Sequence, residues 1–283
     1  MTVAVVVVCL ALVLAGLVAI VRWGGVAFAV PSPDEPGATP PVGQVLRRYL
    51  WWLNIAVAAG FAASVMAAGA GGRLAMRLVA VTADDAAQGQ VTEAGEIVGR
   101  ITVDGTLGFV LFQSFFFGII SGVIYILLRR WLPAGRAGGL AFGLLLLLVA
   151  ATRIDPLRAA NPDFDIVGPG SVAVPVFTAV VLVHGMLVAA LAARMSHALP
   201  LLAARPGAVA AYAPLVLLLP FFPLAIMAAA GALVALGASR VRPLAGAWRG
   251  KAVDLGGRVV LAIVALVSAP AFVTAIADII GRP

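Results

Sequence analysis

The sequence has few charged residues. They occupy 11% of its 283 positions, against about 25% in an average soluble domain. A water-soluble protein of this length could not cover its surface with so few charges, whereas a chain surrounded by lipid does not need to. With 63% hydrophobic residues and a mean hydropathy of +1.12, the composition predicts an integral membrane protein that forms a single domain.

Cysteine and lysine are almost absent. Cys9 is the only cysteine, which excludes disulfides and cysteine metal sites within the chain. Lys251 is the only lysine among 19 basic residues, and the excess of arginine, alanine, valine and glycine resembles the bias of a high-GC genome. The basic residues lie beside apolar runs, as topology signals and lipid-phosphate contacts do. They do not form a nucleic-acid-binding face, so we expect the lipid bilayer as partner and no nucleic acid.

Recognisable catalytic and cofactor motifs are also missing. The sequence contains no nucleotide-binding P-loop, no GxGxxG after a strand, no HExxH, no GxSxG and no metal-spaced Cys/His pairs. We therefore predict no catalytic residues, no cofactor and no metal.

Long apolar runs dominate what is present. They predict an all-α polytopic bundle of about seven transmembrane helices, six of them clear and one possibly broken or re-entrant. The predicted spans are about 1–21, 49–72, 105–128, 139–152, 171–193, 208–236 and 259–280. A Pro-rich linker at 31–43 and a polar loop at 83–104 separate the first three.

The first run has a competing interpretation as a cleaved signal peptide, because Ala27-Phe28-Ala29 resembles a cleavage site. However, the run has no positive segment before it and its apolar core is about 20 residues long, rather than the usual 7–15. An uncleaved helix is the favoured interpretation.

Small residues recur at helical spacing in several spans, which predicts close helix packing. The stripes are Gly60, Ser64, Ala67 and Gly71 in the second span, Gly118 and Gly122 in the third, and Gly139 and Gly143 in the fourth.

The segment 208–236 is the weak point of the topology. As one helix it would measure about 43 Å, longer than the roughly 30 Å hydrocarbon core, and it carries Pro214, Pro220 and Pro223. With a full crossing, which we expect, the basic residues divide 9 to 10 between the two sides, giving no bias. If the segment turns back at Pro220 and Pro223, the division becomes 13 to 6.

Polar groups within the apolar runs are the candidate functional residues. His184 lies in the middle of the fifth span, where the alternatives are a proton relay, a metal or haem ligand, or a neutral histidine bonded to a neighbouring helix. A bis-histidine haem needs a second histidine at similar depth, and His197 lies near the interface, so the structural role is favoured. Asp278 is the best coupling-ion carboxylate if it faces the bundle.

Charged residues at the span ends form the second group of candidates. Arg73 and Arg77 share one helix face and can bind an anionic substrate or lipid headgroup, or pair with Asp84 and Asp85, although interfacial snorkelling is the commoner role. The loops 83–104 and 153–170 are rich in carboxylates. If the two loops meet, their carboxylates can form a cation site or a hydrolytic pair; the alternative is two solvated loops.

Residues 72–106, GRLAMRLVAVTADDAAQGQVTEAGEIVGRITVDGT, and the RRWLP end of the third span resemble a group of uncharacterised multi-pass membrane proteins from high-GC Gram-positive (actinobacterial) bacteria. The resemblance covers about a quarter of the chain. It implies a location in the bacterial cytoplasmic membrane and carries no catalytic residues to transfer.

Two classes of function follow from these features. The favoured one is a non-enzymatic accessory or scaffold component that binds membrane-protein partners or itself. The alternative is a small-solute or ion transporter that uses the Pro-broken sixth span with His184 and Asp278. An enzyme acting on lipid through the acidic loops is the least favoured.

Overall fold

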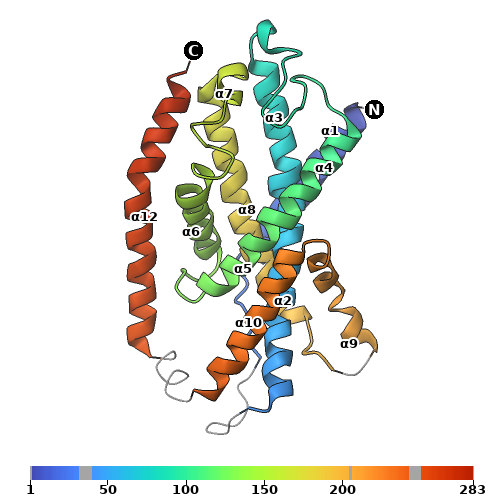
Figure 1. Ribbon diagram of the computed structural model, residues 1–283, viewed down its shortest axis with the longest axis vertical. Coiled ribbons are helices and arrows are strands. Elements are labelled where there is room, and N and C mark those ends of the chain that lie inside the picture. Colours follow the sequence, from blue (N-terminus) through green and yellow to red (C-terminus); the bar gives the residue numbers. More distant parts are fainter. Residues whose placement is uncertain (1, 32–39, 204–205, 242–249, 283) are drawn as a thin grey trace.

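The chain folds into a helical bundle (Figure 1). The computed structural model describes residues 2–31, 40–203, 206–241 and 250–282. The long helices are α1 (Thr2–Trp23), α2 (Val42–Ala63), α3 (Ala70–Thr82), α4 (Val103–Gln113), α5 (Ile119–Leu128), α6 (Arg136–Leu146), α8 (Gly170–Ala198), α10 (Phe222–Arg240) and α12 (Lys251–Ile280). Short elements are η2 (Asp85–Ala87), α7 (Asp163–Ile166), α9 (Pro206–Ala210) and η5 (Ala213–Leu218). The all-α class predicted from the apolar runs is confirmed.

Six helical stretches are long and apolar enough to cross a membrane, and the shorter stretch Arg136–Ala151 is also apolar. π-Helical turns lie within three of these stretches: η1 (Ser64–Gly69) joins α2 to α3, η3 (Ser114–Gly118) joins α4 to α5, and η4 (Leu147–Ala151) follows α6. The stretch Val42–Thr82 is 41 residues long, about twice what a bilayer needs. Its helix exceeds the predicted range 49–72 because it continues through the flanking arginines, which the helical backbone tolerates.

The predicted small-residue stripes bring helices into backbone contact. A Cβ atom on Gly60 would lie 2.1 Å from the carbonyl oxygen of Gly118, and one on Gly122 would lie 2.1 Å from that of Ala56. On the other side of the bundle, a Cβ on Gly185 would lie 2.4 Å from the Cα of Gly143. The prediction of close packing is therefore confirmed for these helices. The main core, around Trp51, Ile55, Phe142 and Leu187, lies between α2, α5, α6 and α8.

The segment 208–236 takes the broken form and not that of one continuous kinked helix. η5 ends at Leu218, Pro220 follows, and α10 begins at Phe222. Phe221 packs at this turn against Phe115 and Phe116 in the middle of the third span, with ring centroids 4.9 and 4.6 Å apart. In Figure 1 the chain rises from α9 to mid-height beside α2 and descends again as α10.

Side chains of α2 hold this hairpin, residues 206–240. Asn54 Nδ2 donates to the carbonyl of Ala211 at 3.0 Å, and the Tyr49 hydroxyl donates to the carbonyl of Ala228. Trp51 Nε1 donates to the carbonyl of Leu199, 2.9 Å away, in the segment that leads into it. Because these donors are spaced along α2, they fix both arms of the hairpin against one helix.

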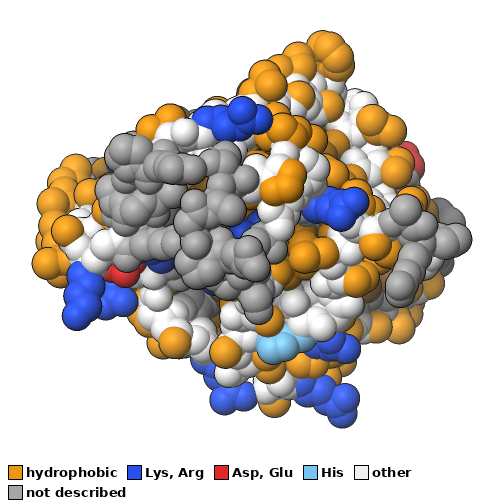
Figure 2. Space-filling model, turned by 90° about the horizontal axis from the view of Figure 1, so that it is seen from below, with side chains coloured by type: hydrophobic (Ala, Val, Ile, Leu, Met, Phe, Trp, Pro, Cys, Tyr) orange, Lys and Arg blue, Asp and Glu red, His pale blue; other side chains and the backbone are white. Residues whose placement is uncertain are grey.

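The two ends of the bundle differ in charge. Ten described basic residues lie at the end of the bundle where α2 and α12 begin and α10 ends, here called the basic end. They are Arg22, Arg47, Arg48, Arg129, Arg130, Arg136, Arg194, Arg240, Lys251 and Arg258. Figure 2 shows Lys and Arg side chains at several places on that face. The opposite end, here called the polar-loop end, carries residues 83–102 and 152–169, both chain termini, and six described arginines.

Candidate functional site: a cavity under the polar loops

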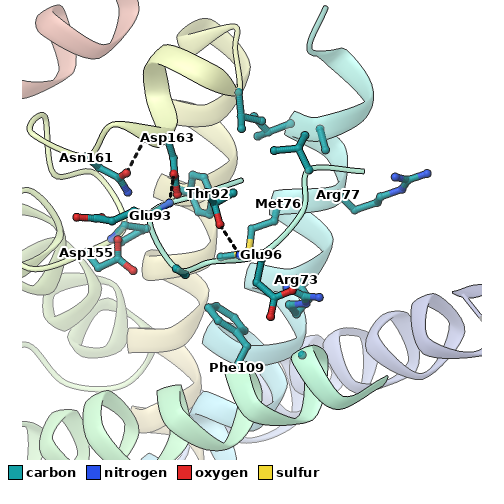
Figure 3. A pocket seen from close by; sticks show the side chains of 18 of the residues that line it. Arg73, Met76, Arg77, Thr92, Glu93, Glu96, Phe109, Asp155, Asn161 and Asp163 are labelled. Atoms are coloured by element: carbon teal, nitrogen blue, oxygen red, sulfur yellow. Dashed lines mark hydrogen bonds between the residues drawn. The ribbon is translucent and has the colours of Figure 1, made fainter. Parts of the chain in front are cut away.

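A cavity of about 620 Å³ lies at the polar-loop end. Its walls come from α3, from α4 and Phe117 of η3, from residues 92–101, and from residues 154–167, with Phe177 of α8 below them. Figure 3 shows side chains from these segments converging on one space. The segments are up to about 100 residues apart in the sequence, so the cavity is a product of the tertiary fold.

The two acidic loops meet above this cavity. Arg158 forms an ion pair with Glu93, and the backbone N–H of Glu93 donates to Asp163 Oδ1 at 2.7 Å. Arg77 anchors the first loop to α3 by donating to the carbonyl of Gly99 at 3.1 Å. Glu93 and Asp163 are thus occupied in joining the loops. Among the described residues no group of three or more His, Cys, Asp or Glu side chains is arranged to hold a metal ion.

A tight turn directs Glu96 toward the cavity. Thr92 accepts a hydrogen bond from the Glu96 N–H through Oγ1 at 3.1 Å, and its own N–H donates to the Glu96 carbonyl at 2.8 Å. Gly95 has a φ of +78°, a left-handed conformation that favours glycine over residues with a Cβ.

Arg73 and Glu96 carry opposite charges and face the same cavity (Figure 3). The Arg73 guanidinium lies 5.8 Å from the centre of the Phe109 ring. Within the described part of the chain, the Arg73 side chain forms no hydrogen bond or ion pair, either with Glu96 or with Asp84 and Asp85. The Glu96 carboxylate lies over the start of α4, where a Cβ on Gly105 would be 2.7 Å from its Oε1.

The cavity is apolar below these charges. Phe109, Phe112, Phe117 and Phe177 line it together with Met76. Phe112 is 52% exposed, on a helix that is apolar enough to cross a membrane. A space with charged groups at one end and phenylalanines at the other suits a molecule with a polar head and an apolar tail.

Asp155 is the remaining carboxylate on the cavity wall. Its side chain keeps solvent contact, but the surrounding protein removes enough water to raise the pKa of the carboxyl to about 6. Arg158 opposes this rise, while Asp163 and Glu93 add to it. Asp155 therefore changes charge near pH 6. Its described carboxylate neighbours Glu93 and Asp163 are already bonded, so they are not free to form a hydrolytic pair with it.

His184 lies elsewhere, in the interior of the bundle. Its side chain is 6% exposed, and Nε2 is hydrogen-bonded to Ser121 Oγ across the α5–α8 contact at 2.8 Å. Ser121 also donates to the carbonyl of Gly118 at 2.8 Å. His184 does not line the cavity described above, and its geometry matches that of a histidine that joins two helices.

The other predicted site residues are dispersed. Asp278 is exposed near the end of α12, while its neighbour Ile279 is buried. Pro220 and Pro223 are exposed at the tip of the hairpin. The structure thus brings Arg73 and Arg77 into one cavity, and places Asp278 and the prolines apart from it and from each other.

Comparison with known proteins adds no further assignment: no family model, curated protein or solved structure matches the chain. The site therefore has to be judged on its own chemistry. Sequence reasoning identified its arginines and acidic loops but missed the phenylalanine floor. The available signal was the recurrence of Phe109, Phe112, Phe116 and Phe117 on the helix that follows the polar loop.

Proposed function

We propose that this protein is a non-enzymatic component of the bacterial cytoplasmic membrane that holds an amphiphilic molecule in the cavity at its polar-loop end. The observation that carries the proposal is that Arg73 and Glu96, of opposite charge, face the same cavity without a bond between them. Arg73 and Glu96 are both half-buried, and partly buried charged groups without a partner are unfavourable. A ligand that contacts both of them lowers that cost.

The chemistry of the walls favours a zwitterionic headgroup. An anionic phosphate suits the Arg73 guanidinium, and an ammonium group suits the carboxylates of Glu96 and Asp155. The apolar tail lies among Phe109 and Phe112. A phospholipid with an amine-bearing headgroup has these features, and an accessory or scaffold role is consistent with holding such a lipid.

The charge of the two ends supports an orientation. Ten described basic residues and one described acidic residue, Asp254, lie at the basic end, against six basic and nine acidic residues at the polar-loop end. Arginine-rich ends face the cytoplasm, so we place the cavity on the outer side. This orientation follows if residues 206–240 form a re-entrant hairpin, and it replaces the full crossing that we expected from the sequence.

The transporter alternative receives less support. It requires His184 and Asp278 to act together with the broken segment, but one is buried against Ser121 and the other is exposed on α12.

Lipid retention tests the proposal. The protein is purified in mild detergent, incubated with equal amounts of phosphatidylethanolamine and phosphatidylglycerol, and examined by native mass spectrometry. We expect Arg73→Gln and Glu96→Gln each to reduce retained phosphatidylethanolamine about tenfold, the effect of losing one charge-assisted hydrogen bond.

Arg153→Gln is the matched control, because Arg153 is exposed at the same end and its side chain, among the described residues, bonds only to the carbonyls of Leu148 and Val149. If all three variants retain phosphatidylethanolamine equally, the proposed function is wrong. The same spectra record any protein partner that remains bound.

A further inference from the structure

A second cavity, of about 650 Å³, lies at the basic end. Its walls are the segment after α1, the end of α5, residues 131–135, the part of α8 nearest the basic end, and α12. The described charged residues that line it are Arg129, Arg130 and Arg258. No carboxylate is among these described lining residues, in contrast to the mixed charges of the first cavity.

Arg129 is held in place by aromatic rings. Its guanidinium carbon lies 4.0 Å from the centre of the Phe28 ring and 4.6 Å from that of Trp52. The two rings are themselves stacked, with centroids 5.2 Å apart and planes 7° apart. Stacking on aromatic faces orients the planar guanidinium and leaves its N–H groups at the edge of the plane.

The Arg129 side chain lacks a hydrogen-bond acceptor in the described part of the chain. It is half-buried, and among the residues that the structure describes it has no hydrogen bond and no ion pair. A guanidinium has five N–H donors and no acceptor, and a partly buried cation without a counter-ion is unfavourable. An anion in the adjoining cavity accepts hydrogen bonds from the N–H donors and balances the positive charge.

α12 brings a further arginine to this cavity. Arg130 forms an ion pair with Asp254, which ties the end of α5 to the first turn of α12. Trp131 packs so closely on α12 that a Cβ atom on Gly257 would lie 2.2 Å from its Nε1. Arg258 follows Asp254 by four residues, on the same helix face, and it lines the cavity with an exposed side chain.

We propose that this second cavity binds the phosphate group of an anionic phospholipid from the leaflet at the basic end. Arg129 supplies oriented N–H donors to the phosphate oxygens, and Arg258 adds a second positive charge. The apolar wall formed by Leu132, Ala189 and Ala193 lies beside the start of the acyl chains. This inference uses different residues from the first cavity and does not depend on the ligand proposed there.

The test measures phosphatidylglycerol retained by the purified full chain, in native mass spectra recorded from the same equal mixture of phosphatidylglycerol and phosphatidylethanolamine. We expect Arg129→Gln to lower retained phosphatidylglycerol about tenfold and Arg258→Gln to lower it severalfold. Arg129→Lys keeps the charge but loses the planar donor group, so its retention should fall between that of the wild type and Arg129→Gln.

Arg47→Gln is the control, because Arg47 is exposed at the same end and does not line the cavity. Equal retention in Arg129→Gln, Arg258→Gln and Arg47→Gln would overturn the proposal. Arg258 is exposed, so its variant keeps the test decisive if Arg129→Gln fails to fold. Addition of inorganic phosphate distinguishes a lipid ligand from a soluble anion. Phosphatidylglycerol that stays bound in its presence supports the lipid. If phosphate binds and phosphatidylglycerol is lost, the ligand is a soluble anion and the lipid proposal is wrong.

Discussion

The contact between α2 and α5 gives the sharpest test of the packing. In Gly60→Ala the new methyl carbon lies 2.1 Å from the Gly118 carbonyl oxygen and 3.0 Å from the Gly122 Cα. Both neighbours are backbone atoms, so no side chain can rotate away. The helices must separate by more than 1 Å to reach an ordinary contact distance of about 3.5 Å.

The expected decrease in the free energy of unfolding of Gly60→Ala follows from two opposing contributions. Overpacking costs about 1–3 kcal/mol, and the higher helix propensity of alanine returns about 1 kcal/mol. Because the obstruction is rigid, we expect Gly60→Ala to lose about 1–2 kcal/mol, which lowers the melting temperature by roughly 2–8 °C. Tryptophan fluorescence during heating in detergent measures this directly.

Gly256→Ala is the matched control for this experiment. Gly256 lies within α12, and a Cβ there would meet no atom within 4 Å. Its melting temperature should stay unchanged or rise slightly. If Gly60→Ala melts at the same temperature as Gly256→Ala, the close backbone contact between α2 and α5 does not exist.

Three further predictions concern charge, the buried histidine and topology. The folded-state pKa of Asp155 is raised to about 6, so its carboxyl favours the folded state at low pH and this benefit is lost as the pH rises through 6. Asp155→Asn should therefore raise the melting temperature at pH 7.5 and leave it nearly unchanged at pH 4; an equal shift at both values contradicts the assignment. His184→Ala should lower the free energy of unfolding by about 2 kcal/mol or more, because it leaves a gap and removes the hydrogen-bond partner of Ser121. Lipid retention in the folded fraction should stay at the wild-type level. Selective loss of lipid retention would show a functional role for His184 instead. Reporters fused after Ala87 and after Arg240 should be read on opposite sides of the membrane, and a common side supports the full crossing.

The helical class and the small-residue contacts could be predicted because both signals are local. Apolar runs longer than a bilayer identify helices, and glycines at four-residue spacing identify the faces that meet. Gly118 and Gly122 meet α2 in this way. No knowledge of the tertiary arrangement is needed for either inference.

The hairpin and the cavities could not be predicted in the same way. A broken segment and a kinked helix have the same apolar content. Which of the two is formed depends on the carbonyl groups to which Asn54 and Tyr49 donate hydrogen bonds. The count of basic residues on the two sides did favour the re-entrant form. Only that form gave one side an excess, 13 to 6. The absence of an ion pair at Arg73 among the described residues is a tertiary property, because Asp84 and Asp85 follow it closely in the sequence and could have paired with it.

Photo-crosslinking at the cavity floor tests the central claim most directly. A photoreactive residue replaces Phe112 in the first cavity or, as a control, Val267 on the exposed face of α12, and the protein is irradiated in vesicles that contain phosphatidylethanolamine. We expect Arg73→Gln to reduce the lipid adduct at position 112 about tenfold and to leave the adduct at position 267 unchanged. Equal adducts at both positions, unaffected by Arg73→Gln, would contradict the central claim.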